Sequence, residues 1–121
     1  AMVTLDRVGL AARCHQQVVD LAHGERRLLE LALALAGRPS LLLLDEPMAG
    51  AGPEESVKMT KIIDTVRQKV GILLIEHDMD AVFKLADRVT VMVEGAIIAS
   101  GPPDTISANR DVRAAYLGGE D

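Results

Sequence analysis

Aromatic residues are almost missing from this 121-residue sequence: they make up 2% of it, with one tyrosine, one phenylalanine and no tryptophan. A core must therefore be packed from aliphatic side chains, for which the hydrophobic content of 49% is sufficient. Single domains usually contain roughly 100–150 residues, so the length corresponds to one domain or to part of one.

Cysteine is represented by Cys14 alone, which excludes a disulfide within the chain and indicates a reducing compartment. Basic runs longer than Arg26-Arg27 are absent, and the formal net charge is −5. Because a nucleic-acid-binding surface needs clustered lysine and arginine, we expect no nucleic-acid partner.

Long apolar runs are absent as well. A membrane-spanning helix needs roughly 18–20 apolar residues, whereas the two longest apolar segments, Leu28–Ala36 and Leu41–Leu44, are separated by a Gly-Arg-Pro sequence. No secretory signal is visible either. We therefore expect any association with a membrane to be made through a partner protein.

Helical and strand-like segments alternate from about residue 20 onward, which predicts an α/β fold with a mainly parallel sheet and flanking helices. Two aliphatic runs, Leu41–Leu44 and Ile72–Ile75, are typical of strands that are covered on both faces. The dipeptide Glu94-Gly95 stands between Val89–Val93 and Ala96–Ala99, which predicts a β-hairpin near the C-terminus.

Helices are expected at about Leu5–Ala12, over Gly24–Ala36, from Pro53 onward, after the capping residue Asp78, and as short helices between Pro102 and Leu117. Apolar residues at helical spacing define the expected buried faces of three of them. These faces are Leu28, Leu31, Ala32 and Leu35; Met59, Ile62, Ile63 and Val66; and Met79, Val82, Phe83 and Ala86.

Two adjacent acids, Asp45 and Glu46, directly follow the first aliphatic run. The carboxyl edge of a sheet is where α/β proteins bind ligands, and consecutive strand residues point to opposite faces. Asp45 is therefore a candidate to hold Mg²⁺ through water, and Glu46 to orient or deprotonate an attacking water. The alternative is a strand that simply ends in solvated acids.

Two further segments carry weaker signals. His77 follows the second aliphatic run, where an imidazole could donate a hydrogen bond to a phosphate oxygen. The segment Leu21–Arg27 precedes a helix, and the free amides of a helix start form an anion site that Gly24 would leave accessible. Taken singly, a structural histidine and an ordinary helix start are the more common interpretations.

Along the chain the three segments follow in the order Leu21–Arg27, Asp45-Glu46 and His77. In this order they resemble the second half of the nucleotide-binding subunit of an ABC transporter. The sequence is most similar to the subunits that energise branched-chain amino acid importers (LivG/LivF type). The resemblance extends from Leu5 to Leu117 and is most specific from Leu21 through Gly52. The segments Gly95–Gly101 and Ala115–Gly118 are typical of the importer subgroup.

The resemblance implies part of the core of P-loop NTPases, with residues 1–23 as a remnant of the helical subdomain and 24–121 as the C-terminal half of the ATPase core. Asp45 matches the magnesium residue that ends the Walker B strand, Glu46 the catalytic glutamate and His77 the switch histidine. The signature motif, whose amides grip the ATP γ-phosphate held by the opposite subunit, corresponds to Leu21, Ala22, His23, Gly24 and Glu25. The D-loop Met48–Gly52, which crosses the dimer interface, includes Gly50, Ala51 and Gly52.

The chain departs from the family pattern at four of these positions. Ala22 replaces a serine whose hydroxyl could bond phosphate, and His23 stands at the usual first glycine of the signature. Glu25 replaces a glutamine, and Gly52 stands where the D-loop commonly ends in aspartate.

The phosphate-binding loop of the family, G-x-x-x-x-G-K-[ST], does not occur in these 121 residues, since none of the four lysines follows a glycine. The amides and the lysine of that loop cradle the phosphates of ATP. We therefore expect weak or no binding of ATP and Mg²⁺ and no measurable ATP turnover by this chain alone. In the family the strand that carries the loop lies between the strands matching Ile72–Ile75 and Val89–Val93, so we also expect open sheet edges that favour self-association.

The sequence is thus interpreted as a fragment of the ATP-binding and hydrolysing subunit of an ABC importer for branched-chain or related amino acids. The resemblance implies a second ATPase subunit and transmembrane permease subunits as partners, and a cytoplasmic location, peripheral on the inner face of the plasma membrane. A non-catalytic interaction or regulatory module derived from an ABC ATPase is the alternative. An ABC ATPase acting outside transport is disfavoured by the acidic balance and the importer-like tail.

Overall fold

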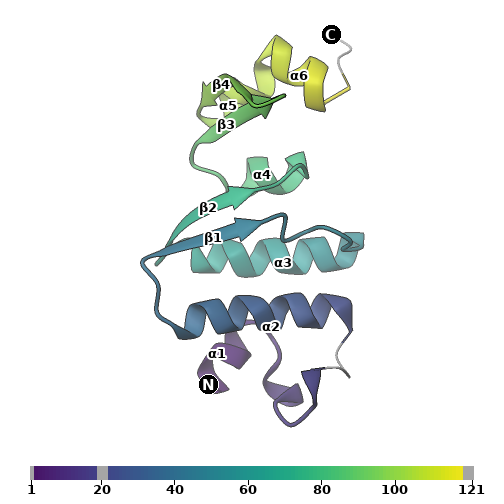
Figure 1. Cartoon of the computed structure of the whole chain (residues 1–121), viewed down its shortest axis with the longest axis vertical. Coiled ribbons are helices and arrows are strands. Elements are labelled where there is room, and N and C mark those ends of the chain that lie inside the picture. Colours follow the sequence, from purple (N-terminus) through teal and green to yellow (C-terminus); the bar gives the residue numbers. More distant parts are fainter. Residues whose placement is uncertain (1, 19–21, 119–121) are drawn as a thin grey trace. The chain divides into compact units, whose positions relative to one another are not determined.

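The computed structural model describes residues 2–18 and 22–118, which divide into two compact units, Ala1–Ile75 and Glu76–Asp121. The first unit contains α1 (Met2–Arg7), a short 3₁₀ helix η1 (Ala11–Arg13), α2 (His23–Ala36), β1 (Leu41–Asp45), α3 (Pro53–Val66) and β2 (Gly71–Ile75) (Figure 1). The second contains α4 (Met79–Leu85), β3 (Val89–Val93), β4 (Ala96–Gly101), α5 (Pro103–Ala108) and α6 (Arg110–Tyr116).

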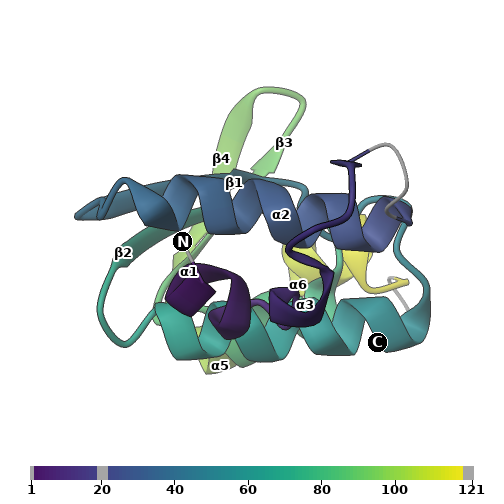
Figure 2. The same ribbon diagram turned by 90° about the horizontal axis from the view of Figure 1, so that it is seen from below.

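The first unit is built on a parallel pair of strands. β1 and β2 pair in register from Leu41 opposite Gly71 to Asp45 opposite Ile75. Figures 1 and 2 show α2 and α3 running side by side in the direction opposite to the strands. As a result, the carboxyl ends of both strands and the N-terminal ends of both helices lie at one end of this unit. This is the edge at which the sequence places Asp45, Glu46 and the segment around Gly24.

The two long helices bury the faces that their spacing predicts. The four apolar residues expected on α2 are all buried, and on α3 three of the four are buried while Ile62 is half-buried. Together with residues of the segment after α1, of β1 and of the turn after β1, they form the aliphatic core of the first unit. The core residues are Val8, Leu10, Leu28, Leu31, Ala32, Leu35, Leu42, Met48, Met59, Ile63 and Val66.

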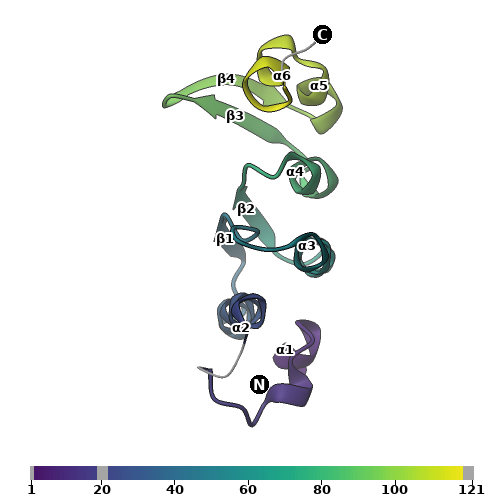
Figure 3. The same ribbon diagram turned by 90° about the vertical axis from the view of Figure 1, so that its right-hand side faces the viewer.

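The strands of the first unit are not covered on both faces, so this part of the sequence prediction is wrong for the chain. Leu42 is buried, but Leu41 is 59% exposed and Leu43 is 67% exposed. On β2, Leu73 and Ile75 are 57% and 55% exposed. Figure 3 shows α3 over one face of the sheet. The alternate residues of the strands therefore form an apolar surface, which we call the open sheet face: Leu41, Leu43, Leu73 and Ile75.

The second unit is an antiparallel hairpin packed against short helices. β3 and β4 pair around Glu94 and Gly95, whose φ angles of +49° and +81° are those of a tight two-residue turn. The predicted hairpin is thus confirmed. Its core is small and aliphatic, formed by Val89, Val91, Ile106 and Val112, with Val82, Phe83, Ala86 and Ala99 packed against it.

The helix α4 is capped as predicted, since the Asp78 carboxylate accepts a hydrogen bond from the Ala81 N–H at 3.2 Å. Its buried face differs from the predicted one: Ala81 and Leu85 are buried, whereas Val82, Phe83 and Ala86 are half-buried. Only Asp80 and Lys84 in this helix are charged, so periodicity alone does not select one apolar face. Within the described ranges, no helix is long and apolar enough to cross a membrane.

The start of α3 gives a test of the fold. Gly52 is the N-cap, with φ −73° and no side-chain cap, and a Cβ there would meet nothing within 4 Å. Aspartate is a preferred N-cap residue, so Gly52→Asp should raise the free energy of unfolding by about 0.5–1 kcal/mol. Thermal unfolding followed by circular dichroism measures the effect.

The matched control is Gly50→Asp, which changes composition and charge identically. Gly50 has φ +75°, a backbone conformation that disfavours a side chain, and its Cβ would lie 3.6 Å from the His23 Nε2. This variant should lower the free energy of unfolding by about 1 kcal/mol. Equal effects of the two substitutions would contradict the described turn.

Candidate functional site

The candidate site begins at the turn after β1, where the chain leaves strand geometry at Glu46. Asp45 is the last residue of β1, and Glu46 has φ +48°, a left-handed conformation that is rare for residues other than glycine. The Glu46 N–H donates to the Ile75 carbonyl of β2 at 2.7 Å, and the Glu46 carbonyl accepts from the Ala49 N–H at 3.0 Å. The alternation rule that we used for the two acids ends at Asp45, because Glu46 belongs to the turn.

A left-handed residue costs free energy, and such residues persist where the surrounding structure holds them. Strained backbone of this kind is common at functional sites, where it aims a side chain. Both Asp45 and Glu46 are exposed at the edge of the sheet. This geometry permits both acids to meet a ligand from solvent.

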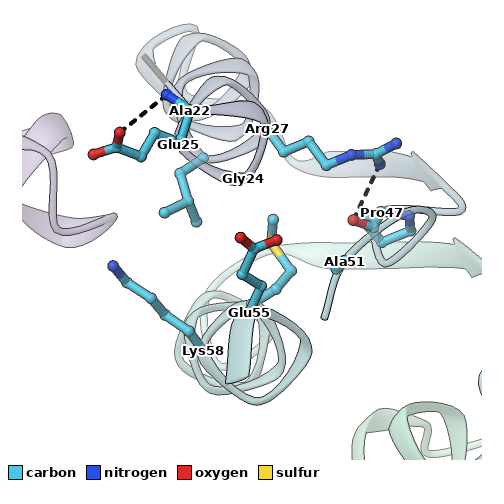
Figure 4. A pocket seen from close by; sticks show the side chains of 10 residues that line it. Ala22, Gly24, Glu25, Arg27, Pro47, Ala51, Glu55 and Lys58 are labelled. Carbon is cyan, nitrogen blue, oxygen red and sulfur yellow. Dashed lines mark hydrogen bonds between the residues drawn. The ribbon is translucent and has the colours of Figure 1, made fainter. Parts of the chain in front are cut away.

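Arg27 of α2 binds this turn from the side. Its Nη1 donates to the carbonyl oxygens of Glu46, at 3.0 Å, and of Pro47, at 3.1 Å. Its Nε donates to the Nε2 of His23, one helical turn earlier, at 3.2 Å. Figure 4 shows the Arg27 side chain reaching from α2 to Pro47. The helix start and the turn after β1 are thus joined although they are far apart along the chain.

The start of α2 is stabilised by Glu25 rather than by a residue at the N-cap position. Ala22 is the N-cap and has no side-chain acceptor, but its own N–H donates to the Glu25 Oε1 at 3.1 Å. The other oxygen, Oε2, lies 3.0 Å from the Arg13 Nε. Glu25, which the resemblance assigned to phosphate binding, therefore already has two partners. Leu21, assigned to the same motif, lies outside the described residues.

A pocket of about 160 Å³ opens between the start of α2, the turn after β1 and α3. Figure 4 shows Glu55 and Lys58 reaching from α3 toward the start of α2. A Cβ at Gly24 would lie 2.9 Å from the Glu55 carboxyl carbon, so the expected anion site faces an acid. A second pocket, of about 210 Å³, is lined by both Arg27 and Asp45.

His77 lies in the second unit, whereas Asp45 and Glu46 lie in the first. Its imidazole is exposed, and its backbone N–H donates to the Glu76 Oε1 at 3.0 Å. The same oxygen accepts from the Asp78 N–H at 3.4 Å and lies 3.7 Å from the His77 Nδ1. The Glu76 carboxylate therefore stabilises the backbone conformation at His77 and Asp78. That His77 and Glu46 face one phosphate stays a prediction.

Three residues that the sequence analysis left unassigned take part in this geometry: Arg13, Arg27 and Glu76. Arg27 is the last residue of the segment Leu21–Arg27, and Glu76 directly precedes His77. Arginine and glutamate are common on surfaces, so their residue types alone do not identify them as part of a site. Among residues 2–18 and 22–118, no group of three or more His, Cys, Asp or Glu side chains is placed to hold a metal ion. Asp45 is the residue that the sequence nominated for Mg²⁺.

Two protein-family patterns match the chain. The pattern described as "ABC transporter" matches residues 1–49, and the one described as "Branched-chain amino acid ATP-binding cassette transporter" matches residues 96–121. The high-affinity branched-chain amino acid transport ATP-binding protein LivG of Escherichia coli K12 is 41% identical over 120 residues, 98% of this chain and 47% of LivG. The high-affinity branched-chain amino acid transport ATP-binding protein BraF of Pseudomonas aeruginosa is 40% identical over 94% of this chain and 46% of its own length. The chain thus spans about half the length of the curated relatives it matches.

Solved structures give the same fold. The ADP conformation of MJ1267, an ATP-binding cassette of an ABC transporter, has a TM-score of 0.83 and 26% identity, over 97% of this chain and 48% of that one. CbiO1 of Clostridium perfringens, part of the ABC transporter complex cbiONQ, has a TM-score of 0.81 and 28% identity, over 96% and 48%.

The backbone at Glu46 gives a test of the site. At a left-handed position glycine is favoured over alanine by about 1 kcal/mol, the reverse of the order in a helix or strand. Glu46→Gly should therefore unfold at a higher denaturant concentration than Glu46→Ala. Urea unfolding of the two variants measures the difference, and an alanine variant at least as stable as the glycine variant would show that residue 46 is not left-handed.

Proposed function

Because this chain belongs to the ATP-binding proteins of ABC transporters, we propose that it is the C-terminal half of an ATPase subunit that energises import of branched-chain or related amino acids. Residues 24–121 are then the C-terminal half of the ATPase core, and residues 1–23 belong to the helical subdomain. The substrate class rests on the similarity to LivG and BraF, which are both branched-chain amino acid transport ATP-binding proteins.

The joining of two motif segments by Arg27 is the observation that supports the proposal most. The guanidinium of a helix that begins with the signature segment binds the two carbonyl groups that follow Asp45. A surface strand ending in solvated acids would need no such contact. The arrangement suits a site in which the helix start and the acids act on one ligand.

The proposed roles follow from these positions. Asp45 would hold Mg²⁺ through water, since Mg²⁺ in nucleotide sites is bound by one or two carboxylates together with phosphates and waters. Glu46 would orient the attacking water and accept its proton, and His77 would donate a hydrogen bond to the terminal phosphate. The amides around Gly24 would contact the phosphate of ATP on the opposite subunit after the Glu55 carboxylate, which lies beside Gly24, has moved away.

The residues present fit the terminal phosphate and its metal rather than a whole nucleotide. Asp45 and Glu46 are exposed carboxylates at the edge of a sheet, and Gly24 leaves the start of α2 without a side chain. Bound Mg²⁺ would supply charge neutralisation at the phosphates. The loop that cradles the other phosphates is not among these 121 residues, so we propose that this chain alone binds ATP weakly or not at all.

The partners of the whole subunit are also proposals. A second ATPase subunit would complete the site across the D-loop residues Gly50, Ala51 and Gly52, and transmembrane permease subunits would hold the pair at the inner face of the plasma membrane. A non-catalytic interaction module of the same fold is the second candidate. The replacements at Ala22 and Gly52 favour it.

ATP hydrolysis distinguishes the two candidates. The chain alone should show no turnover above background, whereas a fusion with the N-terminal half of E. coli LivG in front of it should hydrolyse ATP. In the fusion, Glu46→Gln should lower kcat by about 10²–10⁴-fold, because the attacking water loses its base. A coupled assay of phosphate release measures all three proteins.

Glu94→Gln is the matched control, because it removes the same charge from the hairpin turn of the second unit. It should leave kcat unchanged. Turnover by the chain alone, or a Glu46→Gln fusion as active as the parent fusion, would refute the catalytic proposal.

We propose that the open sheet face, together with the sheet edges expected from the sequence, leads to self-association. Exposed apolar strands invite pairing with another chain, and we propose a second copy of this chain as the occupant. Light scattering after size-exclusion chromatography should give a dimer or larger species at high concentration. Leu73→Lys should shift the chain to a monomer, since it places a charge in the middle of β2.

Val57→Lys is the control for this experiment, since Val57 on α3 is 51% exposed, close to the 57% of Leu73. It should leave the association unchanged. A monomer at every concentration, or equal effects of the two lysines, would argue against the open sheet face as the contact.

A further inference from the structure

We propose that Arg27 is a positioning residue that sets the backbone of Glu46 from the helix that begins with the signature segment. This inference rests on the proposed function in one respect: Glu46 must be the residue that orients water. Arg27 itself touches backbone carbonyls and an imidazole, so its effect on the reaction is exerted through Glu46.

The hydrogen bonds define what Arg27 holds. One nitrogen, Nη1, serves the carbonyl oxygens of Glu46 and Pro47, at 3.0 and 3.1 Å. The Glu46 carbonyl also accepts a hydrogen bond from the Ala49 N–H, and the Glu46 N–H donates to the Ile75 carbonyl. Both peptide groups of Glu46 are therefore fixed, and the φ of +48° between them sets the direction in which its side chain leaves the backbone.

The charge of Arg27 makes this contact stronger than an ordinary turn hydrogen bond. Hydrogen bonds with an ionised donor are roughly twice as strong as neutral ones. Arg27 is half-buried, and its contact with the Pro47 carbonyl is part-buried, so water competes less for that carbonyl, whereas its contact with the Glu46 carbonyl is exposed. The contact is thus suited to hold a left-handed residue that would otherwise relax.

His23 fixes the guanidinium from the other side. Its Nε2 accepts from the Arg27 Nε at 3.2 Å, which requires a neutral imidazole with its proton on Nδ1. With Nε and Nη1 both engaged, rotation of the planar guanidinium about its long axis is restricted. His23 stands at a signature position, so the helix start and the Glu46 turn share one chain of hydrogen bonds.

This chain of hydrogen bonds gives the proposed site a means of coupling. A phosphate that draws the start of α2 toward it would move His23 and Arg27 together, and Arg27 would carry the shift to the Glu46 carbonyl. Lysine cannot replace Arg27 in this role. Its ammonium can reach the two carbonyls as a point charge, but it has no second, rigidly placed donor for His23.

Amide hydrogen exchange of the ¹⁵N-labelled chain tests the proposal without any need for activity. In Arg27→Met, the Ala49 amide, which donates to the Glu46 carbonyl, should exchange about tenfold faster or more, because the turn loses a charge-assisted hydrogen bond. The amide of Leu35, in the buried part of α2, should change by less than about twofold, since the helix itself stays folded. Arg27→Lys should lie between Arg27→Met and the parent chain.

The matched controls are Arg26→Met and Arg26→Lys, on the preceding residue of the same helix. Both should leave the Ala49 amide as it is in the parent chain. The proposal is overturned if the Ala49 amide exchanges at the same rate in the Arg27 and Arg26 variants. It is also overturned if Arg27→Lys raises the exchange rate of the Leu35 amide as much as that of the Ala49 amide, which would indicate a general loss of stability. If Arg27→Met does not fold, the comparison of Arg27→Lys with Arg26→Lys decides the question.

The fusion with the N-terminal half of LivG provides the functional readout. There, Arg27→Lys should lower kcat about tenfold or more while the KM for ATP stays within about twofold, as expected for an interaction that matters in the transition state rather than in binding. An equal loss in the Arg26→Lys fusion, or a rise in KM with unchanged kcat, counts against positioning. A fusion with intact Arg27 that hydrolyses no ATP contradicts the proposed function instead, and the exchange experiment still decides the role of Arg27.

Discussion

The left-handed backbone of Glu46 is the constraint on which the site depends. β1 must stop at Asp45 for the chain to turn there, and the turn is held by β2 through Ile75 and by α2 through Arg27. Without these two contacts, an ordinary residue at this position would return to extended geometry and carry its carboxylate elsewhere. The parallel pairing of β1 with β2 and the packing of α2 beside α3 therefore bring the partners of this turn to the same edge of the sheet.

Much of the fold could be predicted because its signals are local. The spacing of Leu28, Leu31 and Leu35 is enough to define the buried face of α2, and Glu94-Gly95 is a turn in almost any setting. The positions of the site residues on their elements were predictable for the same reason. Asp45 ends a strand, and Gly24 lies in the first turn of a helix, as the aliphatic run and the capping segment indicated.

The contacts that join these elements could not be read from the sequence. Arg27 and Glu46 are 19 residues apart, and no periodicity links a guanidinium to a distant carbonyl. The open sheet face was missed for a related reason: an unbroken aliphatic run is typical of a doubly covered strand whether or not the same chain supplies both covers. In α4, apolar residues on nearly every side left the buried face undetermined until it packed against the hairpin.

A crystal structure of the LivG fusion with a non-hydrolysable ATP analogue and Mg²⁺ tests the account most directly. It should show the Glu46 carboxylate facing the terminal phosphate, with a left-handed residue 46 and Arg27 within hydrogen-bond distance of its carbonyl. A Glu46 in extended conformation that points away from the phosphate, with Arg27 turned to solvent, would contradict it.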